Sequence, residues 1–393
     1  MNFNNPNTKN STAVIRAVCA IVFCIFTFVY LYFYQADVLA VGQHVLSGGA
    51  THYDRMIGCV IITFSLLLLQ IGVYVLFRLD KHCHALTYFP SLLLLTVITD
   101  VSQDIDRGFS FGAWLWVFPL LLLLWGGLSI FVRNYQMYSR VSSYGIFSRA
   151  MWSNMSIMTL LFLFTGLASN GNAVFHYRMK AEKCLLEGNY GEALAVGMKS
   201  LETDDNLTMI RVYALAREGM LGEKLFTYPV EGTSDDMLPY SGDARCMMYP
   251  NDSIYRFIGA KPSGRFRAIP YMKALLRLGM ATPAVKDYIL CGYLIDRDLD
   301  SFAHALPKFY EVDDKLPKHY REALTLYTHL RSKPYIIYHN SVMDTDFSDL
   351  QALERKYKTE AARSVAVNEM YAGTYWWYYM YAKSQARTSP GYH

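Results

Sequence analysis

The residues most suited to chemistry form a short acidic cluster between two apolar stretches of the chain. Asp100, Asp104, Asp106 and Arg107 lie beside segments that are apolar enough to cross a membrane. Carboxylates at a membrane boundary could bind a metal ion or act as a general base toward a lipid-linked substrate. The same composition is ordinary for a solvated loop, so both interpretations of residues 100–107 stay open.

A second pattern with catalytic associations follows directly. The residues from Gly108 to Gly112 read Gly-Phe-Ser-Phe-Gly, which is the Gly-x-Ser-x-Gly pattern of serine hydrolases. Hydrolysis would need a strained strand-to-helix turn, a histidine within hydrogen-bond reach of Ser110 and an oxyanion hole. The sequence instead predicts that a membrane helix begins here, and an N-cap by Ser110 is a sufficient explanation of the serine.

Metal and cofactor sites find little support in the sequence. The residues from Lys81 to His84 offer three metal-capable side chains, but consecutive residues do not easily close one tetrahedral shell. Cys184, Cys246 and Cys291 are the three cysteines of the second half and allow at most one internal disulfide. We therefore assign no catalytic residue, no metal and no cofactor, and the sequence favours a non-enzymatic protein over an enzyme.

The apolar stretches describe a membrane-embedded half. The first 168 residues contain no glutamate, whereas the rest of the chain is charged and rich in tyrosine. A helix needs roughly 20 residues to cross hydrocarbon. We predict a transmembrane domain over residues 1–169 with about five spans, of which the third is the shortest and carries Pro90. The predicted spans are residues 17–34, 56–77, 85–99, 111–132 and 150–169.

Cations in the short loops predict the orientation, because cytoplasmic loops carry an excess of Lys and Arg. One set of loops holds seven cations, whereas the opposite set holds only Arg55 and Arg107. The sequence therefore predicts a protein of the bacterial inner membrane with a cytoplasmic N-terminus and a periplasmic C-terminal domain. The first span is expected to stay as an anchor, since its apolar run exceeds that of a signal peptide. The seven cations are Lys9, Arg16, Arg78, Lys81, Arg133, Arg140 and Arg149.

Residues 170–393 are predicted to form a soluble helical domain. Around a turn at Gly188 to Tyr190, apolar residues follow the spacing of two packed helices, and Gly219 ends a further helix 31 positions after Gly188. Glycine at such turns can adopt the left-handed conformation that ends a helix. Positive and negative residues nearly balance in this half, which argues against a nucleic-acid partner.

The segment from Ala181 to Leu221 resembles the tetratricopeptide repeat (TPR). It has a Gly-x-Tyr turn followed by Glu-Ala-Leu, Ser-Leu and Asp-Asn steps, although the usual proline at the repeat end is absent. Together with Gly219 to Phe226, Asp287 to Leu299 and Thr374 to Tyr379, it resembles an uncharacterised family of bacterial polytopic membrane proteins with repeat-like outer domains. This resemblance implies a TPR-like α-solenoid and supplies no chemistry.

One segment interrupts the helical pattern. Between residues 229 and 266 the composition shifts to Gly, Ser, Asp and Pro, which predicts an inserted loop or lid. At its end, Arg265 and Arg267 stand near Lys261 and could meet an anionic ligand. A solvated basic turn is the alternative interpretation of these cations.

The end of the chain is unusually aromatic, and its densest part is Tyr375, Trp376, Trp377 and Tyr378. Three explanations compete for this predicted C-terminal helix. Its rings could close the last core of a solenoid, lie at the membrane–water boundary, or line a groove for a ligand. Nothing in the spacing selects one ligand class for such a groove.

These observations predict an all-α protein with a transmembrane bundle followed by a soluble helical-repeat domain. The leading hypothesis is a membrane-anchored, non-enzymatic scaffold or adaptor that presents its helical surface to a protein or peptide partner in the cell envelope. The lipid bilayer is its other expected partner. The alternative is an envelope-assembly enzyme, a transferase acting on a lipid-linked sugar, with residues 100–107 as its site.

Overall fold

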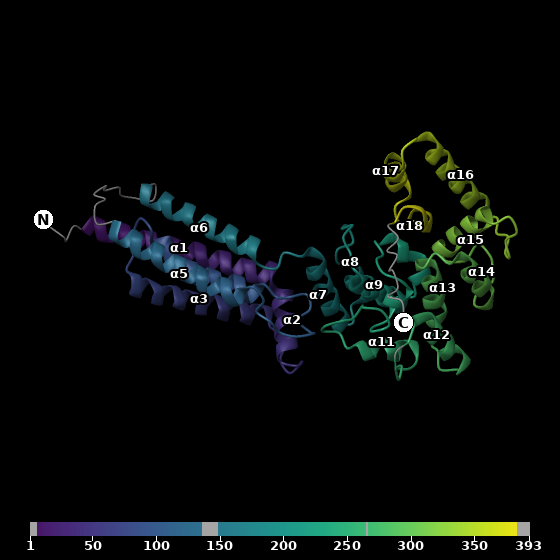
Figure 1. Cartoon of the computed structure of the whole chain (residues 1–393), viewed down its shortest axis with the longest axis horizontal. Helices are drawn as coiled ribbons and strands as arrows, with labels where there is room; N and C mark the ends of the chain where they lie inside the picture. Colours follow the sequence, from purple (N-terminus) through teal and green to yellow (C-terminus); the bar gives the residue numbers. More distant parts are fainter. Residues whose placement is uncertain (1–5, 136–147, 265, 383–393) are drawn as a thin grey trace. The chain divides into compact units, whose positions relative to one another are not determined.

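The computed structural model describes residues 6–135, 148–264 and 266–382 of the 393-residue chain (Figure 1). The chain divides into two compact units, Met1–Asn172 and Ala173–His393. Every regular element in the described ranges is helical, and no residue in them forms a β-strand. The predicted all-α class is therefore confirmed.

The described residues of the first unit form four helices that are long and apolar enough to cross a membrane. Their outward faces expose large apolar side chains such as Leu76, at 74%, and Leu123, at 76%. Such surfaces suit hydrocarbon rather than water, as expected for a membrane protein. The helices are α1 (Pro6–Val29), which continues into a π-helical turn (Tyr30–Tyr34), α3 (Arg55–Phe77), α5 (Trp114–Tyr135) and α6 (Arg149–Ala168).

The predicted span over residues 85–99 differs from these four. It forms a 3₁₀ turn (His84–Tyr88) followed by the 11-residue helix α4 (Phe89–Thr99), which is shorter than a lone crossing requires. Most side chains of α4 are buried, because α3, α5 and α6 pack around it. The described residues thus hold four helices of crossing length instead of the predicted five, together with a short helix shielded inside the bundle.

Contacts near both ends of α4 show its direction. The rings of Phe23 in α1 and Tyr88 at the start of α4 have centroids 4.9 Å apart. At the other end, the hydroxyl of Tyr30 lies 3.5 Å from Oγ1 of Thr99. Helix α4 therefore runs in the same direction as α1, and its buried polar groups find partners within the bundle.

The second unit contains helical hairpins in which a long helix precedes a short one. Each long helix ends at a left-handed residue, Gly188, Gly219 or Arg297, and the next amide bonds to the carbonyl five positions earlier. These hairpins agree with the predicted helical domain, but their second helices of four to seven residues depart from TPR-like pairs of full helices. The pairs are α7 (Ala173–Leu186) with α8 (Tyr190–Ala195), α9 (Asp205–Arg217) with α10 (Leu221–Lys224), and α13 (Val285–Ile295) with α14 (Leu299–Ala305).

Six more helices lie among the described residues of the second unit. Their buried faces belong to one apolar core to which residues from α7 through α18 contribute. In Figure 1, α16 and α17 form the last hairpin, drawn in yellow-green, and α18 follows them. The six helices are α11 (Asn251–Ile258), α12 (Ala268–Arg277), α15 (Lys318–Leu330), α16 (Ser341–Lys356), α17 (Glu360–Tyr371) and α18 (Tyr375–Tyr381).

The predicted insertion over residues 229–266 belongs to the core and is not a loose lid. Met237 within it is fully buried. Three successive amides, at residues 247–249, donate to the carboxylate of Glu182 in α7 at 2.6–3.1 Å. Glu182 is itself buried and pairs with Arg178 at 3.4 Å. The prediction of an irregular segment is wrong for residues 251–258, which form helix α11, while short turns and the bonds to this carboxylate hold the residues before it.

We expect Gly219→Ala to destabilise the second unit by about 1 kcal/mol. The φ angle of Gly219 is +68°, and a Cβ there would meet no neighbouring atom, so the cost comes from the left-handed backbone alone. The control Gly191→Ala lies in α8, where a Cβ is equally uncrowded, and should leave stability unchanged or raise it. Thermal unfolding of the full-length variants measures both effects. Equal losses of stability would contradict this assignment of the turn.

Candidate functional site

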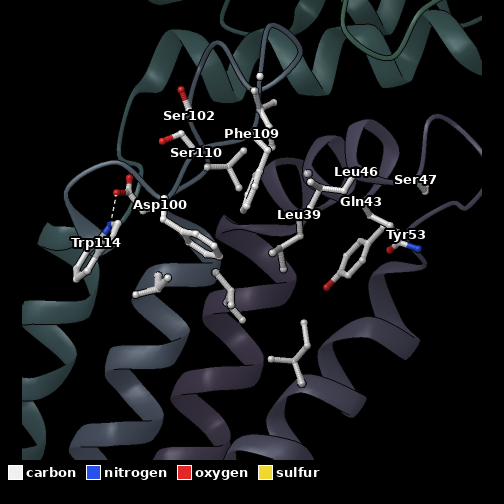
Figure 2. A pocket seen from close by; sticks show the side chains of 18 residues that line it. Leu39, Gln43, Leu46, Ser47, Tyr53, Asp100, Ser102, Phe109, Ser110 and Trp114 are labelled. Carbon is white, nitrogen blue, oxygen red and sulfur yellow. Dashed lines mark hydrogen bonds between the residues drawn. The ribbon is translucent and has the colours of Figure 1, made fainter. Parts of the chain in front are cut away.

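An apolar cavity of about 560 Å³ lies at the end of the bundle where α4 stops (Figure 2). Its walls come mainly from α2 (Ala36–Leu46), the last turn of α4 and the loop over residues 100–113. Most of the lining side chains are apolar, with a few polar groups among them. A cavity of this size and composition is typical of sites for small apolar or amphipathic ligands.

Helix α2 positions one wall of this cavity. It follows the π-helical turn at the end of α1, and its Asp37 pairs with Arg55 at the start of α3 at 3.1 Å. Leu39 and Gln43, one helical turn apart, then line the cavity (Figure 2). Helix α2 was not among the predicted elements, although its mixture of apolar residues with Asp37 and Gln43 is the signal of an amphipathic helix.

Two polar groups mark opposite sides of the cavity (Figure 2). The carboxylate of Asp100 accepts a hydrogen bond from Nε1 of Trp114 at 2.7 Å, which holds it beside the start of α5. Across from it, the hydroxyl of Tyr53 lies 3.8 Å from the thiol of Cys59. Burial raises the pKa of Tyr53 above its ordinary value, so its hydroxyl stays protonated in alkaline as well as neutral solution.

The predicted acidic cluster is divided in the structure. Of its four residues only Asp100 lines the cavity. Asp104 pairs with Arg107 at 3.6 Å, with side chains that are 62% and 60% exposed, and Asp106 is exposed as well. Among the residues that the structure describes, no three His, Cys, Asp or Glu side chains lie close enough together to hold a metal ion. Asp100 is therefore the one member of the cluster that a ligand in the cavity would meet.

Ser110 of the Gly-x-Ser-x-Gly pattern lies in a turn before α5. Its Oγ accepts the amide of Gly112 at 3.0 Å, and α5 begins only at Trp114. The expected N-cap is therefore wrong in detail, because the serine closes a turn ahead of the helix. No hydrogen bond joins Ser110 to a histidine in the described parts of the chain.

The predicted anion contact in the second unit already has carboxylate partners. Nε of Arg267 lies 3.2 Å from Asp235, and Nζ of Lys261 lies 2.8 Å from Asp252. Arg265, the other predicted contact, lies outside the described residues. Because each described cation has an acid beside it, the local field offers little attraction to a further anion.

The aromatic run near the end of the chain is not an exposed surface. Tyr375, Trp376 and Tyr378 are at most 7% exposed, and Trp377 is partly buried. Helix α18 packs against α15, where Nε1 of Trp376 donates to the carbonyl of Glu322 at 2.7 Å. The predicted aromatic ligand surface is therefore wrong for these three side chains, because their rings fill the core.

Part of the second unit matches a known protein family. Residues 269–382, which include most of α12 and all of α18, match a family of unknown function (DUF6057). No curated protein and no solved structure matches the chain. The match agrees with the expected likeness to an uncharacterised family, assigns no activity, and does not include the cavity in the bundle.

We expect Trp376→Phe to destabilise the second unit by about 1–3 kcal/mol, because the carbonyl of Glu322 then loses its donor inside the core. The matched control is Trp377→Phe. The indole nitrogen of Trp377 is buried without a hydrogen-bond partner among the described residues, so its removal should cost less than about 0.5 kcal/mol. Thermal unfolding of the full-length protein compares the two variants. A greater loss for Trp377→Phe would contradict this assignment.

Proposed function

We propose that this protein is a membrane-anchored, non-enzymatic scaffold of the bacterial cell envelope. Its bundle anchors it in the inner membrane and binds the apolar part of a membrane amphiphile. Its second unit presents a helical surface to a protein or peptide partner. The observation that carries the proposal is the apolar cavity at the end of the bundle, with the Asp100 carboxylate at its edge.

The composition of the cavity favours a ligand with an apolar chain and a head group that donates hydrogen bonds. Leu39, Ile62 and Phe109 offer contacts to an apolar chain. Because the chain of a membrane amphiphile already lies in hydrocarbon, its gain in the cavity comes from van der Waals packing rather than from removal from water. The carboxylate of Asp100 accepts hydrogen bonds, as hydroxyl and ammonium groups would supply. A lipid with such a head group meets both requirements.

The charges at the two ends of the bundle support a cytoplasmic N-terminus. The guanidinium of Arg16 lies 4.3 Å from the ring centroid of Tyr74, which brings the N-terminal half of α1 to the end of α3. Arg133 in the last turn of α5 belongs to this end, whereas Arg55 and Arg107 belong to the other. The more basic end then faces the cytoplasm, and the second unit is periplasmic. Two of the counted cations lie outside the described side chains, Lys9 and Arg140.

We expect Gly42→Leu to abolish retention of the amphiphile. A Cβ at Gly42 would touch only Val101, at 3.6 Å, so a leucine there can fill part of the cavity without displacing backbone. The matched control is Gly127→Leu in α5, where a Cβ meets open space. Native mass spectrometry of the protein extracted from its own membranes reports any bound lipid. Wild type and control should keep a lipid that the cavity variant loses; retention by all three would contradict the proposal.

The second candidate function is a transferase acting on a lipid-linked sugar. It is favoured by the position of Asp100, which brings a carboxylate to the edge of an apolar cavity. In that case the neighbouring Asp104 and Asp106 would contribute to a metal or base site, and replacing both by asparagine would stop transfer.

We expect the double variant Asp104→Asn with Asp106→Asn to function like wild type, because both side chains are exposed and do not line the cavity. Complementation of a deletion strain measures function, and thermal unfolding checks that the variant folds. Loss of complementation by a variant with unchanged thermal stability would favour the transferase over the scaffold.

A further inference from the structure

A second cavity, of about 400 Å³, forms a groove on the second unit with basic sides and an apolar floor. It lies among α12, α13 and α14 and includes Lys308 from the 3₁₀ turn (Leu306–Lys308) that follows α14. Ile289 and Tyr293 line it from α13, the helix that packs against both α12 and α14. No Asp or Glu is among the described residues that line this basic groove.

The positive charge of the basic groove is not neutralised from within the protein. Among the described residues, no ion pair involves Lys273, Arg277 or Lys308. The nearby acids are engaged elsewhere: Asp300 pairs with Arg331 at 2.7 Å, and Asp287 accepts the hydroxyls of two tyrosines at 2.7 and 2.9 Å. The groove therefore presents a local positive field to solvent, which attracts anions.

The polar side chains of the groove lie in two rows. The cations Lys273 and Arg277 stand four residues apart on α12, and the imidazole of His304 and the cation Lys308 have the same separation on α14 and the turn that follows it. Four residues of α-helix rise about 6 Å. In an extended peptide, every second side chain points the same way, at a spacing of roughly 6.6–6.8 Å. Successive side chains of an extended segment can therefore face the two rows in turn.

We propose that the basic groove binds an acidic segment of a partner protein in an extended conformation. Carboxylates at alternate positions meet Lys273 and Arg277 on one side, and those between them meet the side that carries Lys308. A single phosphate would instead favour donors that converge on one point. Ile289 and Tyr293 are nearly buried, so the apolar surface that a peptide can cover comes mainly from Leu276, which is 37% exposed, and the partly exposed Phe309.

This inference rests on the scaffold part of the proposed function, because it names the chemistry of the partner. It does not depend on the amphiphile, since the basic groove and the cavity of the bundle lie in different units. The groove also falls within residues 269–382, the segment matched to the family of unknown function.

The test uses the full-length protein in nanodiscs of zwitterionic phosphatidylcholine and a fluorescein-labelled peptide with an uninterrupted run of Asp and Glu. Fluorescence anisotropy should show binding that weakens as salt is raised. The double variant Arg277→Glu with Lys308→Glu should weaken it at least about tenfold. The matched control, Lys199→Glu with Lys315→Glu, makes the same charge change at exposed residues that do not line the groove, and should stay within about twofold.

Several outcomes would overturn the assignment. One is that a peptide with Asn and Gln in place of Asp and Glu binds as tightly as the acidic peptide. Another is that the groove variant and the control variant lose the same amount of affinity for the acidic peptide. Displacement of the peptide by inorganic phosphate of similar affinity would indicate a small-anion site instead. Groove-dependent binding to phosphatidylglycerol vesicles without peptide binding would indicate membrane contact. If the groove variant still retains a stoichiometric protein partner in native mass spectrometry, the groove assignment fails while the scaffold proposal survives.

Discussion

The first unit depends on one constraint: a helix too short to cross hydrocarbon alone must be surrounded by protein that satisfies its polar groups. Helix α4 meets this constraint inside a shell of longer helices and ends at Thr99. Beyond that end, α2 and the loop over residues 100–113 cover the space without filling it, which leaves the cavity. The candidate site therefore follows from the length of one helix, and the Asp100 carboxylate adds a polar contact at its edge.

A different constraint shapes the second unit, where short helices must turn back sharply onto long ones. The same left-handed turn ends α7, α9 and α13, with glycine at two of these positions and Arg297 at the third. Arg297 compensates for its less favourable backbone by donating to the carbonyls of Tyr378 and Ala382, at 3.1 and 2.6 Å. One hairpin turn thus also fixes the C-terminal end of α18, so local backbone geometry and the closure of the core are coupled.

The sequence predicted the parts of the fold where a single physical requirement restricts a whole segment to one type of residue. Hydrocarbon demands long apolar runs, so the four long helices were predicted to within a few residues. The segment over residues 85–99 was predicted as a span because burial in protein and exposure to lipid select the same side chains. Asp100 was recognised as a candidate, but the cavity was not, since it arises from the packing of segments that no local pattern connects. For the aromatic residues of α18, burial in the core was one of three explanations left open. The helix that covers them, α15, is also distant in the sequence, so no local pattern could select among the three.

The carboxylate of Glu182 has a consequence for the order in which the chain can fold during synthesis. Its three amide donors lie 65 to 67 residues further along the chain. A ribosome adds roughly 5–20 residues per second, so this carboxylate waits several seconds for its partners after it has been made. Throughout that interval α7 is an incomplete element that exposes apolar surface. The membrane helices, which precede it in the chain, are already available for insertion, so anchoring comes before the second unit can close its core.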